Sequence, residues 1–268
     1  MILWCDGAHS PAENMRRDAA LLAAQLATLS RTLPRTPPGA GRAVLRLFRF
    51  APAGITLGAN QRPERELDLE RVGAAGVPWA VRPTGGRAIW HDQEWTFSLA
   101  CRLGPGGWAP DAAAAYARTT GLLERAFRSL GVPVERSPGT PRGVGSPRGA
   151  AGPAAPCFAS TARHELTLDG RKFAGIAQRE SGGGLLQQGS LLLGDSHLRL
   201  AHWLRADEPA RGRVRAALAA ATAHAGAWIP GDAPLERLAD ALAPLLAGAE
   251  RVVGEAGAAL AEPEAAER

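Results

Sequence analysis

The fold is decided by His164-Glu-Leu-Thr-Leu-Asp169-Gly170-Arg-Lys172-Phe-Ala-Gly175-Ile-Ala-Gln178, in which Asp-Gly joins two alternating polar and apolar runs. An Asp-Gly pair between such runs is a strong signal for a two-residue β-hairpin turn. Lys172 then falls on the second strand, just past the turn. After a glycine-rich turn, the apolar residues over 185–193 predict a third strand. The middle of the chain should therefore form antiparallel sheet.

Further elements can be read outward from this hairpin. Ser10 precedes proline at the first helical position and glutamate at the third, which is a typical helix start. We predict strands over 43–50 and 88–102, a short strand within 51–61, and helices over 68–75, 111–130, 211–223 and 234–246. Strands followed by helices, without regular βαβ alternation, predict an α+β fold whose central sheet is mixed and largely antiparallel, with flanking helices.

The chain of 268 residues is long enough for one large core. We expect a single domain over 1–260, with C-terminal helices over 206–260 and a frayed tail over 261–268. The stretch 136–156 consists almost entirely of Pro, Gly, Ser, Arg and Ala, so we expect a flexible loop there.

The composition excludes several classes of protein. Cys5, Cys101 and Cys157 cannot all pair and lack metal-site spacing, which excludes a disulfide framework and a zinc finger. No signal peptide opens the sequence, and the apolar stretches are too short to span a bilayer. We therefore expect a cytoplasmic protein without membrane contact.

The charges suggest an acidic partner. The formal net charge is +5 and the sequence pI is about 10.0. The excess of basic residues lies in 1–134. We favour an acidic protein over nucleic acid, because the arginines are scattered and no nucleic-acid-binding motif is present. The basic residues include only one lysine, Lys172, which indicates a site that needs a compact ammonium.

Cys157 is the candidate nucleophile, because it follows the flexible loop and its thiol should be accessible. A neighbouring cation such as Lys172 would favour the reactive thiolate. Cys5 and Cys101 are expected to be small buried hydrophobic residues. We expect His164 and His197 to be surface or structural residues.

Adjacent glycines at Thr84-Gly85-Gly86 can let a ligand approach the backbone, although a plain turn explains them equally well. His91, on the strand that follows, is either a hydrogen-bonded structural histidine or a general base. No phosphate-binding or dinucleotide-binding motif is present. We expect neither a metal nor a cofactor.

Taken together, the ordered motifs of the chain resemble the lipoate-protein ligase A and octanoyltransferase family. The motifs are Ala12-Glu-Asn-Met15, Leu57-Gly-Ala-Asn-Gln61, Arg82-Pro-Thr-Gly-Gly-Arg87-Ala-Ile-Trp-His91, Cys157-Phe158, Gly170-Arg-Lys172-Phe-Ala-Gly175-Ile-Ala-Gln178 and Leu186-Gln-Gln-Gly189-Ser190. The resemblance implies a fold like the catalytic domain of biotin and lipoate ligases, which is class II synthetase-like. It also implies that Lys172 contacts an acyl carbonyl.

The resemblance implies substrate-binding roles for Arg82, Thr84, Gly85, Gly86, Arg87, His91, Gly175, Ile176 and Ala177. Two residues depart from the family pattern, which commonly has serine where Ile176 stands and histidine where Gln188 stands. These departures bear on the acyl chain that is accepted.

Within the family, a cysteine ahead of the hairpin marks LipM-type octanoyltransferases. The resemblance thus implies transfer of octanoyl from octanoyl-acyl carrier protein, through a Cys157 thioester, to a lysine of a lipoyl-carrier protein such as the glycine cleavage H protein. We expect a monomer that needs no ATP. Three alternatives stay open: an ATP-dependent lipoate-protein ligase, an amidotransferase between lipoyl domains, and a non-catalytic acyl-binding or carrier-binding homologue.

Overall fold

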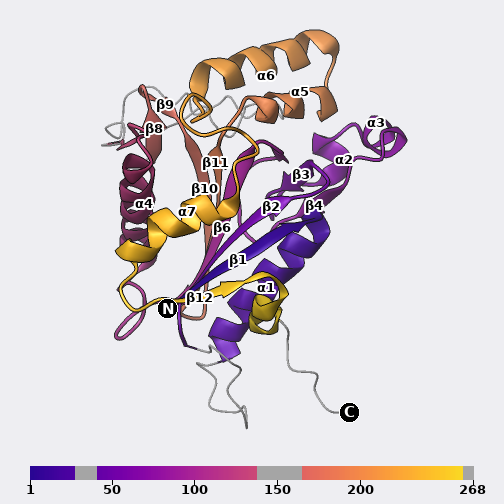
Figure 1. Cartoon of the computed structure of the whole chain (residues 1–268). Coiled ribbons are helices and arrows are strands. Elements are labelled where there is room, and N and C mark those ends of the chain that lie inside the picture. Colours follow the sequence, from indigo (N-terminus) through magenta and orange to yellow (C-terminus); the bar gives the residue numbers. More distant parts are fainter. Residues whose placement is uncertain (28–40, 138–164, 262–268) are drawn as a thin grey trace, which may run out of the picture.

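A six-stranded sheet runs through the centre of the molecule (Figure 1). The computed structural model describes residues 1–27, 41–137 and 165–261. The strand order is β10-β11-β6-β2-β1-β12. Their bounds are β1 Ile2–His9, β2 Val44–Phe50, β6 Glu94–Arg102, β10 Ala174–Ser181, β11 Gly184–Leu192 and β12 Glu250–Val253.

The sheet is mixed, as the sequence predicts. Neighbours from β10 through β11 and β6 to β2 are antiparallel, whereas β1 is parallel to both β2 and β12. Strand β1 was not predicted, and β12 lies within 206–260, where helices alone were expected. That expectation was wrong for β12, because this short edge strand has exposed charged residues and no apolar alternation.

Helices cover both faces of the central sheet (Figure 1). Helix α1 (Pro11–Ala27) lies on one face, and α4 (Ala112–Ser129) and α7 (Leu235–Leu242) lie on the other. The predicted cap of α1 forms: Ser10 Oγ accepts a hydrogen bond from the Glu13 amide at 3.2 Å. Asp111 Oδ1 accepts one from the Ala114 amide at 2.7 Å, and so begins α4.

The main apolar core lies between the central sheet and the helices α4 and α7. It contains Phe97, Leu99 and Phe127, each almost fully buried. Cys5 and Cys101 belong to the same cluster, which confirms that both are buried hydrophobic residues.

A second, three-stranded sheet stands beside the central one, in the order β4-β3-β5. The strands are β3 Gly54–Leu57, β4 Trp79–Val81 and β5 Ile89–His91. The single strand predicted over 88–102 is therefore wrong: it breaks at residues 92–93, and its halves join different sheets. Local alternation cannot reveal this break, because both halves are largely buried.

The predicted hairpin is present, with positive φ angles of 51° at Asp169 and 72° at Gly170. It joins β8 (Leu166–Leu168) to β9 (Arg171–Lys172), and β7 (Glu135–Arg136) completes a third sheet. The second predicted run is split after Lys172. Phe173 enters the apolar core, and the chain then continues as β10 of the central sheet.

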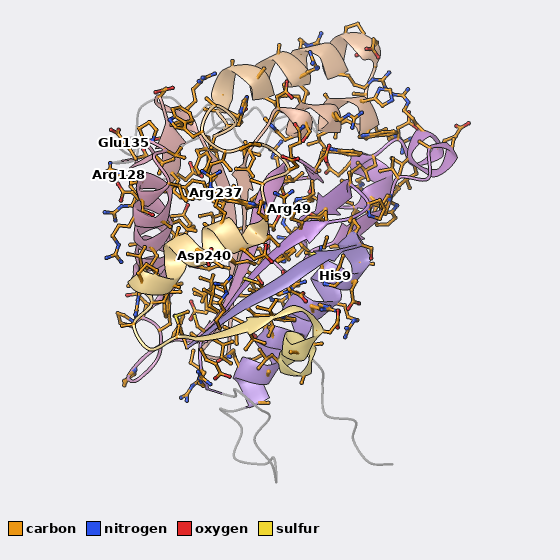
Figure 2. The ribbon with its side chains drawn as sticks, in the orientation of Figure 1. His9, Arg49, Arg128, Glu135, Arg237 and Asp240 are labelled. Atoms are coloured by element: carbon orange, nitrogen blue, oxygen red, sulfur yellow. The ribbon has the colours of Figure 1, made fainter. Side chains whose placement is uncertain are left out.

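The remaining elements surround this framework. They are α2 Pro63–Glu66, α3 Leu69–Ala74, α5 Leu200–Trp203, α6 Glu208–Ala221, and the 3₁₀ helices Ser196–Arg199, Ala243–Leu245 and Gly254–Ala261. Arg49, near the end of β2, donates to the carbonyls of Gly231 and Ala233 and ties the sheet to the segment before α7 (Figure 2). None of the helices in the described part of the chain is both long and apolar enough to cross a membrane.

Candidate active site

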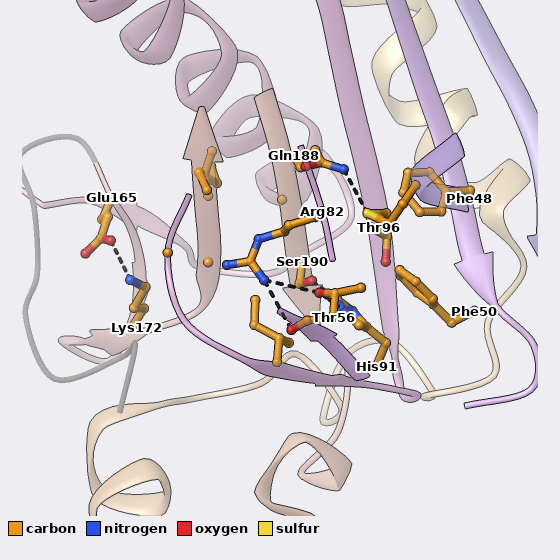
Figure 3. Close-up of a pocket in the computed structure, with 17 residues that line it drawn as sticks. Phe48, Phe50, Thr56, Arg82, His91, Thr96, Glu165, Lys172, Gln188 and Ser190 are labelled. Carbon is orange, nitrogen blue, oxygen red and sulfur yellow. Dashed lines mark hydrogen bonds and ion pairs between the residues drawn. The ribbon is translucent and has the colours of Figure 1, made fainter. Parts of the chain in front are cut away.

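A cavity of about 240 Å³ lies between the central sheet and the β3–β5 sheet (Figure 3). Its walls come from α1, the Gly85–Gly86 turn, and the strands β2, β3, β5, β6, β9, β10 and β11. The lining residues are Met15, Phe48, Phe50, Thr56, Arg82, Gly86, Ile89, His91, Thr96, Glu165, Lys172, Gly175, Ile176, Ala177, Gln188, Gly189 and Ser190.

At one end of the cavity, the only lysine of the chain forms a buried ion pair. Lys172 Nζ lies 2.5 Å from Glu165 Oε1, and the two side chains are only 8% and 7% exposed. Strands β8 and β9 bring them together, since Lys172 pairs with Thr167, two residues beyond Glu165. Little water can reach this pair, so its charges act on nearby groups with little screening.

Arg82 holds the wall that contains the two glycines. Its guanidinium donates to the carbonyls of Gly85 and Arg87, each at 2.8 Å, and to Thr56 Oγ1 at 3.2 Å. Gly86 has a φ of 95°, and a Cβ added at Gly58 would lie 2.1 Å from the Gly86 carbonyl oxygen. Glycine is therefore needed at both positions, and Arg82 makes the turn rigid.

The Glu94 carboxylate is hydrogen-bonded to three polar side chains beside the cavity. Its Oε1 lies 2.6 Å from His91 Nδ1 and accepts hydrogen bonds from Thr96 Oγ1 at 2.7 Å and Ser190 Oγ at 3.1 Å. The other ring nitrogen of His91 lies 2.7 Å from Thr56 Oγ1. His91 is therefore a hydrogen-bonded buried histidine in this structure, as one of the two alternatives held.

Gln188 connects the cavity to α1. It accepts a hydrogen bond from Thr84 Oγ1 at 2.7 Å, and its amide nitrogen donates to Asp18 Oδ2 at 2.6 Å. Both of its polar atoms are thus occupied, and the orientation of its amide is set by the two partners.

The structure brings most of the predicted site residues together. Those lining the cavity are Arg82, Gly86, His91, Lys172, Gly175, Ile176 and Ala177. Thr84, Gly85 and Arg87 stand behind this wall and do not line it. Cys157 lies outside the described residues, as do the predicted 136–156 loop from residue 138 onward and His164.

Sequence reasoning missed Glu165 and the aromatic pair Phe48 and Phe50. A signal for Glu165 was available, because it directly precedes the first strand of the hairpin and stands two residues before Thr167, which pairs with Lys172. Phe48 gave no signal, since strand β2 contains several large apolar residues on both faces.

Other titratable groups serve the fold. Burial raises the pKa of the Cys101 thiol to about 12 and also raises that of Cys5. Burial lowers the pKa of His197, whose Nε2 lies 2.8 Å from Thr222 Oγ1. His197 is thus a structural residue, as expected.

Among the described residues, one group of side chains has ligand atoms close enough for a metal ion: Asp6, His9 and Glu255. Arg17 already donates to Asp6 Oδ1 at 2.5 Å and to Glu255 Oε1 at 2.9 Å. A metal ion would meet this guanidinium, so the donor set does not fit a cation.

Comparison with known proteins identifies the family. The sequence model of one protein family, described as the lipoyl protein ligase A/B catalytic domain, matches residues 10–224. The chain belongs to this family. The chain is similar to the octanoyltransferase LipM of Moorella thermoacetica, which is 37% identical over 191 residues, a match that covers 70% of this chain and 63% of that protein. LipM of Macrococcus caseolyticus is 34% identical over 186 residues, covering 69% and 62%. The match thus spans less than two thirds of these relatives.

Solved structures of the family share the fold. A lipoate-protein ligase A crystallised with ATP superposes with a TM-score of 0.64 at 18% identity, covering 97% of this chain and 92% of that one. The bipartite ligase of Thermoplasma acidophilum, studied with its E2 lipoyl domain, gives 0.65 at 19% identity, covering 97% and 89%. The predicted biotin and lipoate ligase-like fold is confirmed.

Proposed function

We propose that this protein is an octanoyltransferase of protein lipoylation that uses Cys157 as its nucleophile. The observation that carries the proposal is the buried Lys172 ammonium at one end of a cavity with aromatic walls at the other end. The relatives named octanoyltransferase LipM support the choice of the octanoyl group.

In the first step, the Cys157 thiolate attacks the carbonyl carbon of the octanoyl thioester on acyl carrier protein. A new carbon–sulfur bond forms, the bond to the carrier sulfur breaks, and the carrier leaves as a thiol after taking up a proton. In the second step, the amine of an acceptor lysine attacks the enzyme thioester. An amide forms, Cys157 returns as the thiol, and no ATP is consumed because the donor is already activated.

Lys172 would hold the acyl carbonyl oxygen as negative charge develops on it, with backbone amides of 175–177 nearby. Glu165 holds the ammonium in place before the acyl group arrives. The glycine turn braced by Arg82 would lie along the acyl chain, and Thr84, Gly85 and Arg87 would act through that turn.

The acceptor in this proposal is a lipoyl-carrier protein such as the glycine cleavage H protein. The basic excess of residues 1–134 supports acidic carrier partners, since opposite charge speeds encounter and weakens with salt. We also propose a cytoplasmic location and a single catalytic unit over residues 1–260. Free thiols at Cys5 and Cys101 agree with a reducing compartment.

The test is the intact mass of the protein after incubation with octanoyl-acyl carrier protein and no ATP. We expect one octanoyl adduct that hydroxylamine removes and that Cys157→Ala lacks, whereas the matched variant Cys101→Ala keeps it. Transfer that requires ATP and a free acid would instead identify a ligase. An adduct that appears only with octanoylated lipoyl domain as donor would identify an amidotransferase.

A further inference from the structure

A second hollow, of about 540 Å³, lies between β5 and the helices α5 and α6. Strand β5 separates it from the cavity, because successive side chains of a strand point to opposite faces. Ile89 and His91 line the cavity, whereas Trp90 lines the second hollow. We call this hollow the outer groove. Its lining includes Trp90, Arg199, Trp203, Glu208, Arg211 and Arg215.

The outer groove has an excess of positive charge. Its lining contains three arginines but a single acidic residue, Glu208, whose Oε2 already accepts a hydrogen bond from Arg211 Nη2 at 2.9 Å. Arg199 lies 3.8 Å from Asp92, and its side chain is 67% exposed, so this ion pair is weak. Arg215 is exposed and has no hydrogen-bonded or ion-paired partner in the described part of the chain. The groove therefore suits an anionic partner.

Two aromatic rings stand among these charges. Trp90 and Trp203 stack with ring centroids 5.8 Å apart and an angle of 12° between their planes. The Arg199 guanidinium lies 5.8 Å from the centroid of Trp90. The Nε1 atoms of both indoles are buried and have no hydrogen-bond partner among the described residues. Tryptophan and arginine are the side chains that most often dominate the affinity of protein interfaces. The groove thus has the composition of a docking surface for an acidic protein.

Helix α6 connects the outer groove to the Lys172 end of the cavity. It packs against α5 at one end and against β9 at the other (Figure 1). Thr222, which follows the helix, forms a β-bridge with Lys172. Since an α-helix rises about 1.5 Å per residue, Thr222 lies about 10 Å along the axis from Arg215 and about 16 Å from Arg211. Between them, the exposed residues over 216–220 are all alanines, so no long side chain stands in the way.

This separation distinguishes the donor from the acceptor. A lysine side chain has about five bonds between Cα and Nζ and reaches only about 6 Å, so an acceptor seated in the outer groove would not bring its amine to Lys172. The acyl group of acyl carrier protein is attached through a phosphopantetheine arm instead. That arm has about fourteen bonds and extends to about 17 Å, which matches the length of α6 that must be crossed.

We propose that the outer groove is the docking surface for the acyl carrier protein that delivers the octanoyl group. Acidic residues of the carrier contact Arg199, Arg211 and Arg215, and the arm runs along α6 toward Lys172. The inference rests on the proposed function, because it takes an acyl thioester as the substrate beside Lys172. It adds the place where the donor binds. These arginines lie outside residues 1–134, so the distribution of charge along the sequence does not reveal them.

The test is calorimetric titration of Cys157→Ala with octanoyl-acyl carrier protein, so that binding is measured without transfer. Adding Arg215→Glu should raise the Kd at least about tenfold at low salt, because like charges then face each other across the interface. The Kd should also depend less steeply on salt. Arg125→Glu is the matched control, since Arg125 is an exposed arginine of α4, on the far side of the central sheet. It should change the Kd by less than about twofold, because salt screens distant charges.

A second readout uses the protein with Cys157 intact. The rate of octanoyl labelling is measured with octanoyl-acyl carrier protein and with octanoyl-pantetheine, which carries the same thioester without the carrier. The ratio of the two rates should fall about tenfold in Arg215→Glu, because only the carrier meets the reversed charge. If Arg215→Glu does not fold, Arg199→Glu takes its place. Weaker binding of the acceptor, with unchanged binding of the donor, would overturn the assignment.

The outcomes separate the docking surface from the proposed function. Loss of carrier binding in Arg215→Glu, without any adduct at Cys157 in the otherwise unchanged protein, would refute the transfer mechanism and leave the docking surface standing. An adduct at Cys157 together with unchanged carrier affinity in Arg215→Glu and Arg199→Glu would do the reverse. Equal losses in Arg215→Glu and Arg125→Glu would show attraction by the overall charge alone and would also overturn the docking surface.

Discussion

The two faces of the central sheet use alternate residues of the same strands, yet they differ in character. On β6, Phe97 and Leu99 join the apolar cluster under α4 and α7, whereas Thr96 and Ser98 face α1 and the cavity. Both faces are almost fully buried. The apolar face needs only close packing, but the polar face must give every donor and acceptor a partner.

Arg46 is the centre of the polar face. Its side chain is fully buried, donates to Asp6 Oδ2 at 2.7 Å, to Asp18 Oδ1 at 2.8 Å and to Asn14 Oδ1 at 2.6 Å, and lies over the ring of Phe48. Asp18 also accepts a hydrogen bond from Gln188, which lines the cavity, so the network of hydrogen bonds extends to the cavity. The face of the sheet that forms the floor of the cavity therefore depends on buried ion pairs, whereas the cluster on the opposite face, as far as the described residues go, is made of hydrophobic side chains.

The largest expected effect on stability follows from removing the Arg46 side chain. Arg46→Ala leaves Asp6 and Asp18 with uncompensated negative charge in a buried site, and we expect the free energy of unfolding to fall by about 3–5 kcal/mol. Urea unfolding followed by circular dichroism measures it. Arg213→Ala, at an exposed arginine of α6, should stay within about 0.5 kcal/mol. A loss below about 1 kcal/mol in Arg46→Ala would contradict the comparison.

Gln187 and Gln188 are neighbours on β11 and point to opposite faces of the sheet, so substitutions at these two residues compare the faces directly. Gln188 has partners at both polar atoms, whereas Gln187 Oε1 has none among the described residues. We expect Gln188→Leu to lower the free energy of unfolding by about 2 kcal/mol, since Thr84 and Asp18 each lose a partner.

Gln187→Leu should leave the stability unchanged or raise it, because it removes a buried acceptor without a partner. The hydrogen bond that is also lost, from Gln187 Nε2 to Gln178 Oε1, leaves an exposed amide that water can reach. The same urea titrations compare the two variants. Equal losses in both would show that the faces do not differ in the way described.

The smallest expected effect is on the reactivity of the cysteine thiols, and it involves no change in stability. Burial raises the pKa of Cys101 to about 12, so almost no thiolate exists there at pH 8, and it also raises the pKa of Cys5; both side chains are buried from the reagent. Brief treatment of the folded protein with iodoacetamide at pH 8 should give a single adduct, at Cys157. Three adducts should appear after unfolding in urea. Two or more adducts on the folded protein would show that the apolar face is open to solvent.

Much of the fold could be predicted from local signals. The Asp169-Gly170 hairpin and the capped helices α1 and α4 follow from turn and cap chemistry within a few residues. The break at residues 92–93 and the strand β12 could not be predicted, because each depends on pairing with strands remote in sequence.

The candidate site shows the same division. Glycines and an isolated lysine stand out in the sequence, so Gly86 and Lys172 could be singled out. Phe48 and Glu94 could not, because their roles depend on the register between β2 and β6 and on the turn that returns His91 toward Glu94. Cys157 stays a prediction that the thiol and mass measurements test.

The parallel pairing of β1 with β12 has a consequence for the order of folding. Residues 2–5 pair with residues 250–253, so this contact spans most of the chain. Contacts between such distant segments form late, because closing the long loop between them costs conformational entropy before the contact can stabilise the fold. During synthesis, the first strand emerges long before its outer neighbour exists. Until β12 has been made, β1 pairs only with β2. The outer edge of β1 then stays open to pairing with a strand of another chain.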